Sequence, residues 1–150
     1  MIVGFLVNGA ILGAVLVVIA FLLSRFTRDI VGRALLVVAL LIAALAYVLF
    51  ATWAGERPSW VVGELVGVGI YGTMAVLGLR RSPWWLAAGW AAHPIWDVVL
   101  HYLGSGSSVA PEGWVIACVS FDLLVASYIA IASGRGLVRQ RGLALRHGAQ

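Results

Sequence analysis

The sequence predicts an all-α integral membrane protein, a polytopic bundle of five transmembrane helices. Of its 150 residues, 63% are hydrophobic and 11% are charged, and the mean hydropathy is +1.04. A soluble domain of this length has too small a core to bury so much apolar surface, so the expected solvent is lipid. The chain also contains no lysine, which excludes a Schiff base to retinal or pyridoxal phosphate and a Walker-A lysine.

Five apolar stretches divide the chain into predicted helices. They are residues 2–23, 31–53, 60–79, 84–103 and 114–132. Each is 19 to 23 residues long, which suffices to cross ~30 Å of hydrocarbon at ~1.5 Å per residue. The first stretch lacks the basic start and the small-residue cleavage site of a signal peptide, so we expect it to remain as a helix. Residues 1–132 are therefore predicted to form one transmembrane domain, followed by a basic cytoplasmic tail over 133–150.

The arginines predict the orientation of this bundle. Nine of the ten lie around the first and third connections or in the tail: Arg25, Arg28, Arg33, Arg80, Arg81, Arg135, Arg139, Arg141 and Arg146. Because basic residues concentrate on the cytoplasmic side, we expect the N-terminus outside and the C-terminus inside the plasma (inner) membrane. The net charge of +4 is then explained by topology and by attraction to anionic membrane lipid, and no nucleic-acid partner is expected.

Small residues recur at the spacing that lets membrane helices approach closely. Gly9 and Gly13 form one GxxxG pair in the first stretch, and Gly63 and Gly67 form another in the third. We expect these pairs to pack helices within one chain, with a homo-oligomer as the alternative.

Ionisable residues within the predicted spans indicate a functional site. Five of them interrupt the apolar stretches: Glu64, His93, Asp97, His101 and Asp122. A charge in a lipid-embedded helix costs on the order of 2.5–3.5 kcal/mol, so such residues are functional candidates. Counted from the predicted ends of the spans, all five lie between roughly 3 and 15 Å below the outer surface. We therefore expect a cavity, formed mainly by the third, fourth and fifth spans, that opens outward or into the outer leaflet. Asn8, near 10 Å depth in the first span, is expected to join it.

The fourth stretch carries the densest pattern. His93, Asp97 and His101 lie at positions i, i+4 and i+8, which share one face of a regular helix. Pro94 removes a backbone donor beside them, and such a proline typically kinks a membrane helix.

We interpret this pattern first as an enzyme that performs acid–base chemistry on a hydrophobic substrate. A buried carboxyl can donate a proton while a neighbouring group accepts one. Asp97 is the expected proton donor, with His93 and His101 as relays and Glu64 and Asp122 as the second acid and base. Aromatic faces can stabilise a developing carbocation, which suits isomerisation or cyclisation of an isoprenoid- or sterol-like lipid. The expected substrate contacts are Trp90, Trp96, Tyr71, Tyr102 and Asn8.

Two alternatives remain open. His93, Asp97, His101 and Asp122 include pairs spaced to bind a divalent metal, which would activate water for hydrolysis of a lipid ester or amide. His93 and His101 lie about 12 Å apart along a regular helix and cannot easily share one ion. The third possibility is a non-enzymatic ion-binding or accessory subunit. The sequence assigns no cofactor, and a divalent metal ion stays open.

The stretch GWAAHPIWDVVLHY, residues 89–102, resembles the signature G-W-x-x-H-x-x-W-D-V-V-x-H of a family of small bacterial integral membrane proteins of unknown function. The similarity covers roughly residues 59–130, and the first two spans match only in being apolar. The resemblance implies that six residues belong together: Glu64, His93, Trp96, Asp97, His101 and Asp122. It brings no activity with it. The pair His-x-x-x-Asp on a membrane helix is also similar to the pattern of emopamil-binding-type sterol isomerases.

Overall fold

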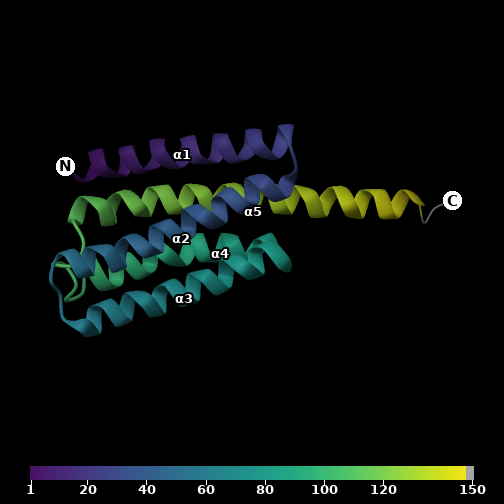
Figure 1. The fold of residues 1–150 in the computed structure, drawn as a ribbon. Helices are drawn as coiled ribbons and strands as arrows, with labels where there is room; N and C mark the ends of the chain where they lie inside the picture. Colours follow the sequence, from purple (N-terminus) through teal and green to yellow (C-terminus); the bar gives the residue numbers. More distant parts are fainter. Residues whose placement is uncertain (148–150) are drawn as a thin grey trace.

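Helices of alternating direction run side by side through the molecule (Figure 1). The computed structural model describes the backbone of residues 1–147 and the side chains of residues 1–135. The helical elements are α1 (Ile2–Phe26), α2 (Asp29–Trp53), α3 (Pro58–Arg80), α4 (Pro83–Asp97), the π-helix η1 (Val98–Tyr102) and α5 (Glu112–His147). By length and composition, α1, α2, α3 and the first part of α5 can each cross a membrane. The prediction of an all-α bundle is confirmed.

The fourth predicted span differs from a regular helix. The α-helical part, α4, has 15 residues and contains Pro94, and the chain then continues as the five-residue π-helix η1. The N–H of Leu103 donates to the carbonyl of Val98, 2.9 Å away, five residues earlier in the chain. A π-turn holds more residues than an α-turn, so side chains beyond Asp97 point in directions that a period of 3.6 residues does not predict.

The helix α5 is longer than predicted. The sequence predicted a span over 114–132 and a separate tail, whereas α5 continues without interruption to His147. No proline follows Pro111 in the sequence, so nothing in the chain forces the helix to end at the membrane surface.

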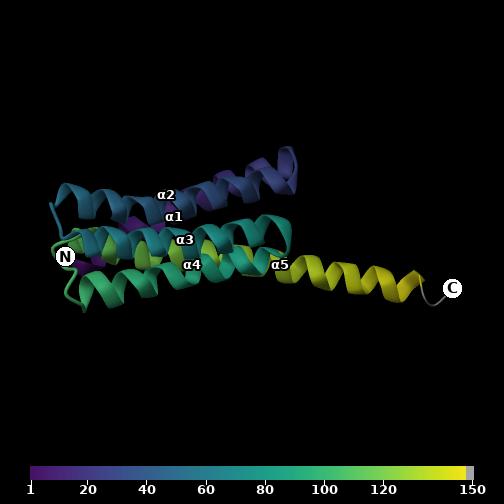
Figure 2. The ribbon, with the colours of Figure 1, turned by 60° about the horizontal axis from the view of Figure 1, so that its bottom comes forward.

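The helices pack in a closed ring that follows the chain order. α1 contacts α2, α2 contacts α3, α3 contacts α4, α4 contacts α5, and α5 returns to α1. Figure 2 shows α5 beside α4 and extending beyond the other helices. The ring brings residues of α2, α3, α4 and α5 to a shared interior.

The two GxxxG pairs have different roles. A side chain at Gly9 would overlap the carbonyl oxygen of Ala117, and one at Gly13 would lie 3.0 Å from that of Phe121. This pair therefore packs α1 against α5 within one chain, as predicted. Gly63 has no neighbouring atom of the described residues within 4 Å of an added Cβ, whereas Gly67 faces the Trp96 ring at 3.3 Å. Gly67 thus makes room for the Trp96 side chain, and the second pair does not bring two helix backbones together.

The polar contact between α1 and α5 provides a test of this interface. The Ser120 hydroxyl donates to the Leu6 carbonyl of α1 at 2.7 Å, whereas the Ser127 hydroxyl donates at 2.7 Å to Leu123 of its own helix. We expect Ser120→Ala to lower the free energy of unfolding in detergent by about 1 kcal/mol, and Ser127→Ala to lower it less. Equal effects of the two substitutions would show that the hydrogen bond from Ser120 to Leu6 adds nothing to the stability.

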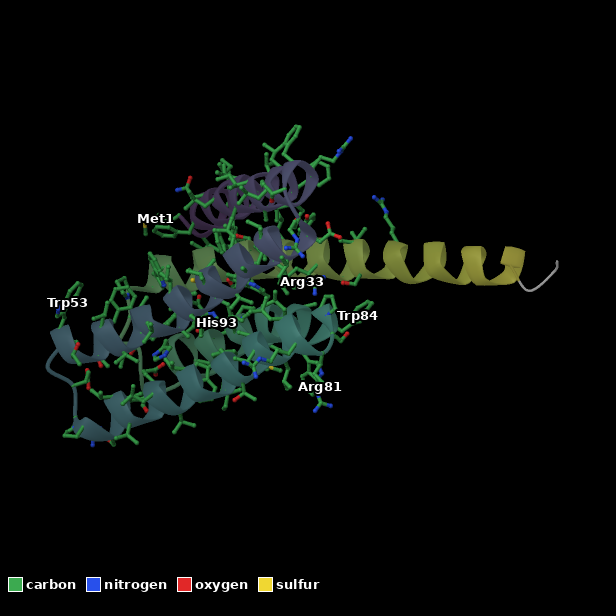
Figure 3. All side chains as sticks on the ribbon, turned by 45° about the vertical axis from the view of Figure 1, so that its right-hand side comes forward. Met1, Arg33, Trp53, Arg81, Trp84 and His93 are labelled. Carbon is green, nitrogen blue, oxygen red and sulfur yellow. The ribbon has the colours of Figure 1, made fainter. Side chains whose placement is uncertain are left out.

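The arginine-rich connections gather at one end of the bundle. Figure 3 shows Arg33, Arg81 and Trp84 at this end, Met1 and Trp53 at the opposite end, and His93 between them. We call these the arginine-rich end and the Trp53 end. The arginines of the first and third connections thus lie at the same end, as the predicted orientation requires. Which side of the membrane this end faces stays a prediction.

Candidate functional site

Five buried ionisable side chains meet inside the ring. They are Glu64 of α3, His93 and Asp97 of α4, His101 of η1 and Asp122 of α5, and each is between 0% and 3% exposed. These are the five residues for which the sequence predicted catalytic roles. The structure arranges them in two groups.

The first group is a triad centred on His93. The imidazole Nδ1 lies 2.9 Å from a carboxylate oxygen of Asp122 and 3.3 Å from one of Asp97. A ring nitrogen carries at most one hydrogen. The shorter distance to Asp122 shows that the hydrogen between the imidazole and the two carboxyl groups lies mainly on the path to Asp122. Both oxygens of Asp97 and the other oxygen of Asp122 have no hydrogen-bond partner among the described side chains. The triad therefore holds unsatisfied acceptors in an apolar interior, where such groups are costly.

The second group is the pair of His101 and Glu64. The His101 Nδ1 lies 3.1 Å from the carbonyl oxygen of Gly106, and its Nε2 lies 3.1 Å from Glu64. The carbonyl can only accept, so Nδ1 carries a hydrogen. The close approach of Nε2 to the carboxyl oxygen is then favourable only if a further proton lies on one of the two. The indole N–H of Trp96 donates to the other oxygen of Glu64 at 3.4 Å.

Tyr47 of α2 lies between the two groups and was missed by the sequence analysis. Its ring stacks on His101, with ring centres 4.8 Å apart and planes at 21°, and meets His93 at 5.8 Å and 67°. The side chain is 1% exposed, and its hydroxyl has no hydrogen-bond partner within residues 1–135. The sequence does contain a signal for this residue, because Tyr47 is the only polar side chain between positions 34 and 51.

Two of the predicted substrate-contact residues border the site. The Tyr71 ring centre lies 4.9 Å from that of His93 and 6.3 Å from that of Trp96. Tyr71 and Trp96 therefore form an aromatic wall on the side of α3 and α4.

The structure does not bring the other three predicted contacts to the site. Trp90 is fully buried in the hydrophobic core, where its ring lies 5.7 Å from that of Phe121. Tyr102 is 42% exposed. Asn8 is exposed on α1, because it is turned about 100° around the helix axis from Gly9, which faces α5.

The predicted outward cavity is a second point of difference. The crevice beside the triad is lined by Tyr47, Gly67, Tyr71, Trp96 and their neighbours, and it has no room for a water molecule. A cavity of about 640 Å³ lies instead at the arginine-rich end, between α1, α2, α4 and α5. The expectation of an open cavity at the ionisable residues is therefore wrong for this structure, because three aromatic side chains fill the space.

The comparison with family models identifies the relationship of this chain. The model of a family of unknown function, DUF6010, matches residues 7–135. The chain belongs to DUF6010. No curated protein matched the chain, and no solved structure matched it. The resemblance to a family of unknown function is thereby confirmed, while the exact form of the motif and a bacterial origin stay predictions.

The DUF6010 match is more extensive than the resemblance read from the sequence. It begins at residue 7 and so includes α1 and α2, which the resemblance treated as merely apolar. Tyr47 of α2 and the five ionisable residues therefore all lie within the DUF6010 domain.

The triad of this DUF6010 protein also has a donor set suited to a metal ion. His93, Asp97 and Asp122 each offer one ligand atom, and these atoms lie within 4.8 Å of one another. A tetrahedral ion with bonds of about 2.0–2.1 Å separates its ligands by about 3.3 Å, close to the 2.9 and 3.3 Å from the His93 Nδ1 to the two carboxyl groups. His101, which the sequence included among possible ligands, lies outside this set and contacts Glu64 instead.

Proposed function

We propose that this DUF6010 protein is an enzyme of the plasma membrane that performs acid–base chemistry on a hydrophobic lipid. The observation that carries the proposal is the position of the His93 Nδ1 between two buried carboxyl groups, one of which has no hydrogen-bond partner within the described residues. Such an arrangement has no evident benefit for stability, because unsatisfied polar groups destabilise a buried interior. It does suit a site that passes a proton from one group to another.

Each residue of the triad has a distinct role in this proposal. Asp97 is the proton donor to the substrate, since its oxygens form no hydrogen bond within residues 1–135, and the His93 Nδ1 lies 3.3 Å from one of them. His93 returns a proton to Asp97, and Asp122 orients the imidazole through its 2.9 Å contact. The pair of His101 and Glu64 supplies the second acid and base. Isomerisation of a double bond needs both, because a proton is added at one carbon and removed from another.

The aromatic side chains indicate the class of substrate. Tyr47, Tyr71 and Trp96 border the crevice beside the triad, and their π-faces would stabilise a carbocation formed by protonation of a double bond. An isoprenoid- or sterol-like lipid meets this requirement. Gly67 leaves room for the Trp96 ring to lie against α3, at the border of the crevice.

The test compares lipid extracts of cells that produce the wild type, Asp97→Asn or Glu112→Gln. General acid–base catalysis contributes about 10²–10⁴-fold to a rate, so we expect Asp97→Asn to lower the amount of a wild-type-dependent lipid product at least a hundredfold. Glu112→Gln is the matched control, because Glu112 is an exposed acid at the start of α5. Mass spectrometry of the extracts measures the product. An unchanged product level in Asp97→Asn, with the variant folded in the membrane, would refute the assignment.

A second candidate, a metal-dependent hydrolase of a lipid ester or amide, is favoured by the close grouping of the three ligand atoms. When bound, a divalent ion would activate water there. Elemental analysis of the same purified proteins separates the two candidates. One transition-metal ion per chain in the wild type, lost in Asp97→Asn and retained in His101→Gln, would favour the hydrolase. A metal-free wild type with a wild-type-dependent product would favour the acid–base enzyme.

A further inference from the structure

The cavity at the arginine-rich end is separate from the site described above. Its volume is about 640 Å³, and its polar lining residues are Ser24, Arg25, Asp29, Arg33, Ser82 and Ser133, with Tyr128 beside them. Ser82 lies eleven residues before His93 on α4, which corresponds to about 16 Å along a helix axis. The cavity therefore needs an explanation of its own, independent of the chemistry proposed for the buried triad.

The charges around the cavity favour an anion. Arg25 and Arg33 outnumber Asp29, the one acid among the described lining residues. Neither arginine forms an ion pair with another side chain of residues 1–135. The helices α2 and α4 begin beside the cavity, at Asp29 and Pro83, and α1 ends beside it, at Phe26. Positive and negative helix ends therefore lie together here, and the excess positive charge comes from the two arginines. The guanidinium groups of Arg25 and Arg33 are thus available to an external ligand.

The apolar part of the lining indicates that this ligand is amphiphilic. The buried side chains of Ala20, Leu36 and Ile129 line the cavity together with the charged residues. Trp84 also lines it and is 46% exposed, as expected for a tryptophan at a membrane interface. A soluble anion would gain nothing from these apolar contacts, whereas a lipid would place its head group on the arginines and the start of its chains against the apolar surface.

We propose that this cavity binds the phosphate head group of an anionic membrane lipid. Arg25 and Arg33 contact the phosphate, since a guanidinium matches two phosphate oxygens at once. The hydroxyls of Ser24, Ser82 and Ser133 are within the same lining and can donate to the remaining oxygens. Asp29 limits the affinity because it repels the ligand.

Native mass spectrometry of the full chain in detergent tests the proposal, with phosphatidylglycerol as the probe and diacylglycerol as its uncharged counterpart. We expect the double variant Arg25→Gln/Arg33→Gln to bind phosphatidylglycerol at least tenfold more weakly, as the loss of charge-assisted hydrogen bonds implies. Asp29→Asn is expected to bind severalfold more tightly. This gain keeps the proposal testable even if the double variant folds poorly.

The matched control is Arg81→Gln. Arg81 is exposed at the same end of the bundle but does not line the cavity, so this variant is expected to change the affinity less than about twofold. Equal losses in Arg81→Gln and in the double variant would indicate general surface attraction and overturn the proposal. So would diacylglycerol binding as tightly as phosphatidylglycerol. If inorganic phosphate at millimolar concentration displaces the lipid fully, the cavity recognises a soluble anion and the assignment to a lipid fails.

Discussion

Replacing Asp122 alone by valine is expected to lower the free energy of unfolding by about 3–5 kcal/mol, which is the typical cost of removing one partner from a buried charged pair. The substitution would remove the 2.9 Å partner of the His93 Nδ1 at a site that is 1% exposed, and would leave this nitrogen only the longer, 3.3 Å contact with Asp97. Unfolding by denaturant in detergent micelles, followed by circular dichroism, measures the change. Ser127→Val is the matched control, because it introduces valine at an exposed position of the same helix and is expected to change stability by less than about 0.5 kcal/mol.

The triple variant His93→Leu/Asp97→Val/Asp122→Val extends this experiment. Replacing a whole buried ionic group by apolar side chains is often neutral or stabilising by about 1–4 kcal/mol, so we expect the triple variant to be at least as stable as the wild type. A triple variant as unstable as Asp122→Val would contradict this expectation and show that the triad holds the bundle together. If the triple variant regains the stability of the wild type, the triad is kept at a cost to stability, as expected of a functional site.

Substitution of Gly9 by valine is expected to lower the free energy of unfolding by about 3 kcal/mol, the upper end of the usual range for overpacking a tight contact. The new Cβ would overlap the carbonyl oxygen of Ala117. Because this atom belongs to the backbone of α5, it cannot turn aside, and α1 would have to move away from the bundle. The same unfolding measurement detects the loss.

Gly63 provides the control for this prediction. An added Cβ at Gly63 has no atom of the described residues within 4 Å, and Gly63→Val keeps the same change of residue type within a helix. We expect its stability to remain within about 0.5 kcal/mol of the wild type. If Gly63→Val were as destabilising as Gly9→Val, the effect would come from helix propensity or membrane insertion and not from the contact between α1 and α5.

The position of Tyr47 suggests how the two ionisable groups act as one site. Its ring contacts both imidazoles, and its buried hydroxyl has no hydrogen-bond partner in the part of the chain whose side chains are described. Within the proposed function, Tyr47 is therefore a positioning residue that fixes the orientation of both histidines.

Much of this protein could be predicted from its sequence because lipid imposes strict local requirements. A helix must satisfy its own backbone hydrogen bonds and must be long enough to cross the hydrocarbon. Four of the five predicted stretches accordingly correspond to helices that are long and apolar enough to span a membrane. Ionisable residues in such stretches are rare, so the five candidate residues could be named before their contacts were known. The i, i+4 spacing of His93 and Asp97 correctly placed the two side chains on one face.

Only the tertiary structure decided how these residues pair. His93 meets Asp122 of α5, 29 residues away, and His101, in the π-helix η1, meets Glu64 of α3. The rotation of each helix about its axis places Tyr47 inside the site and Asn8 outside it. In a membrane protein the lipid-facing and inward-facing surfaces are both apolar, so hydropathy does not reveal which face is buried; close packing between helices determines it.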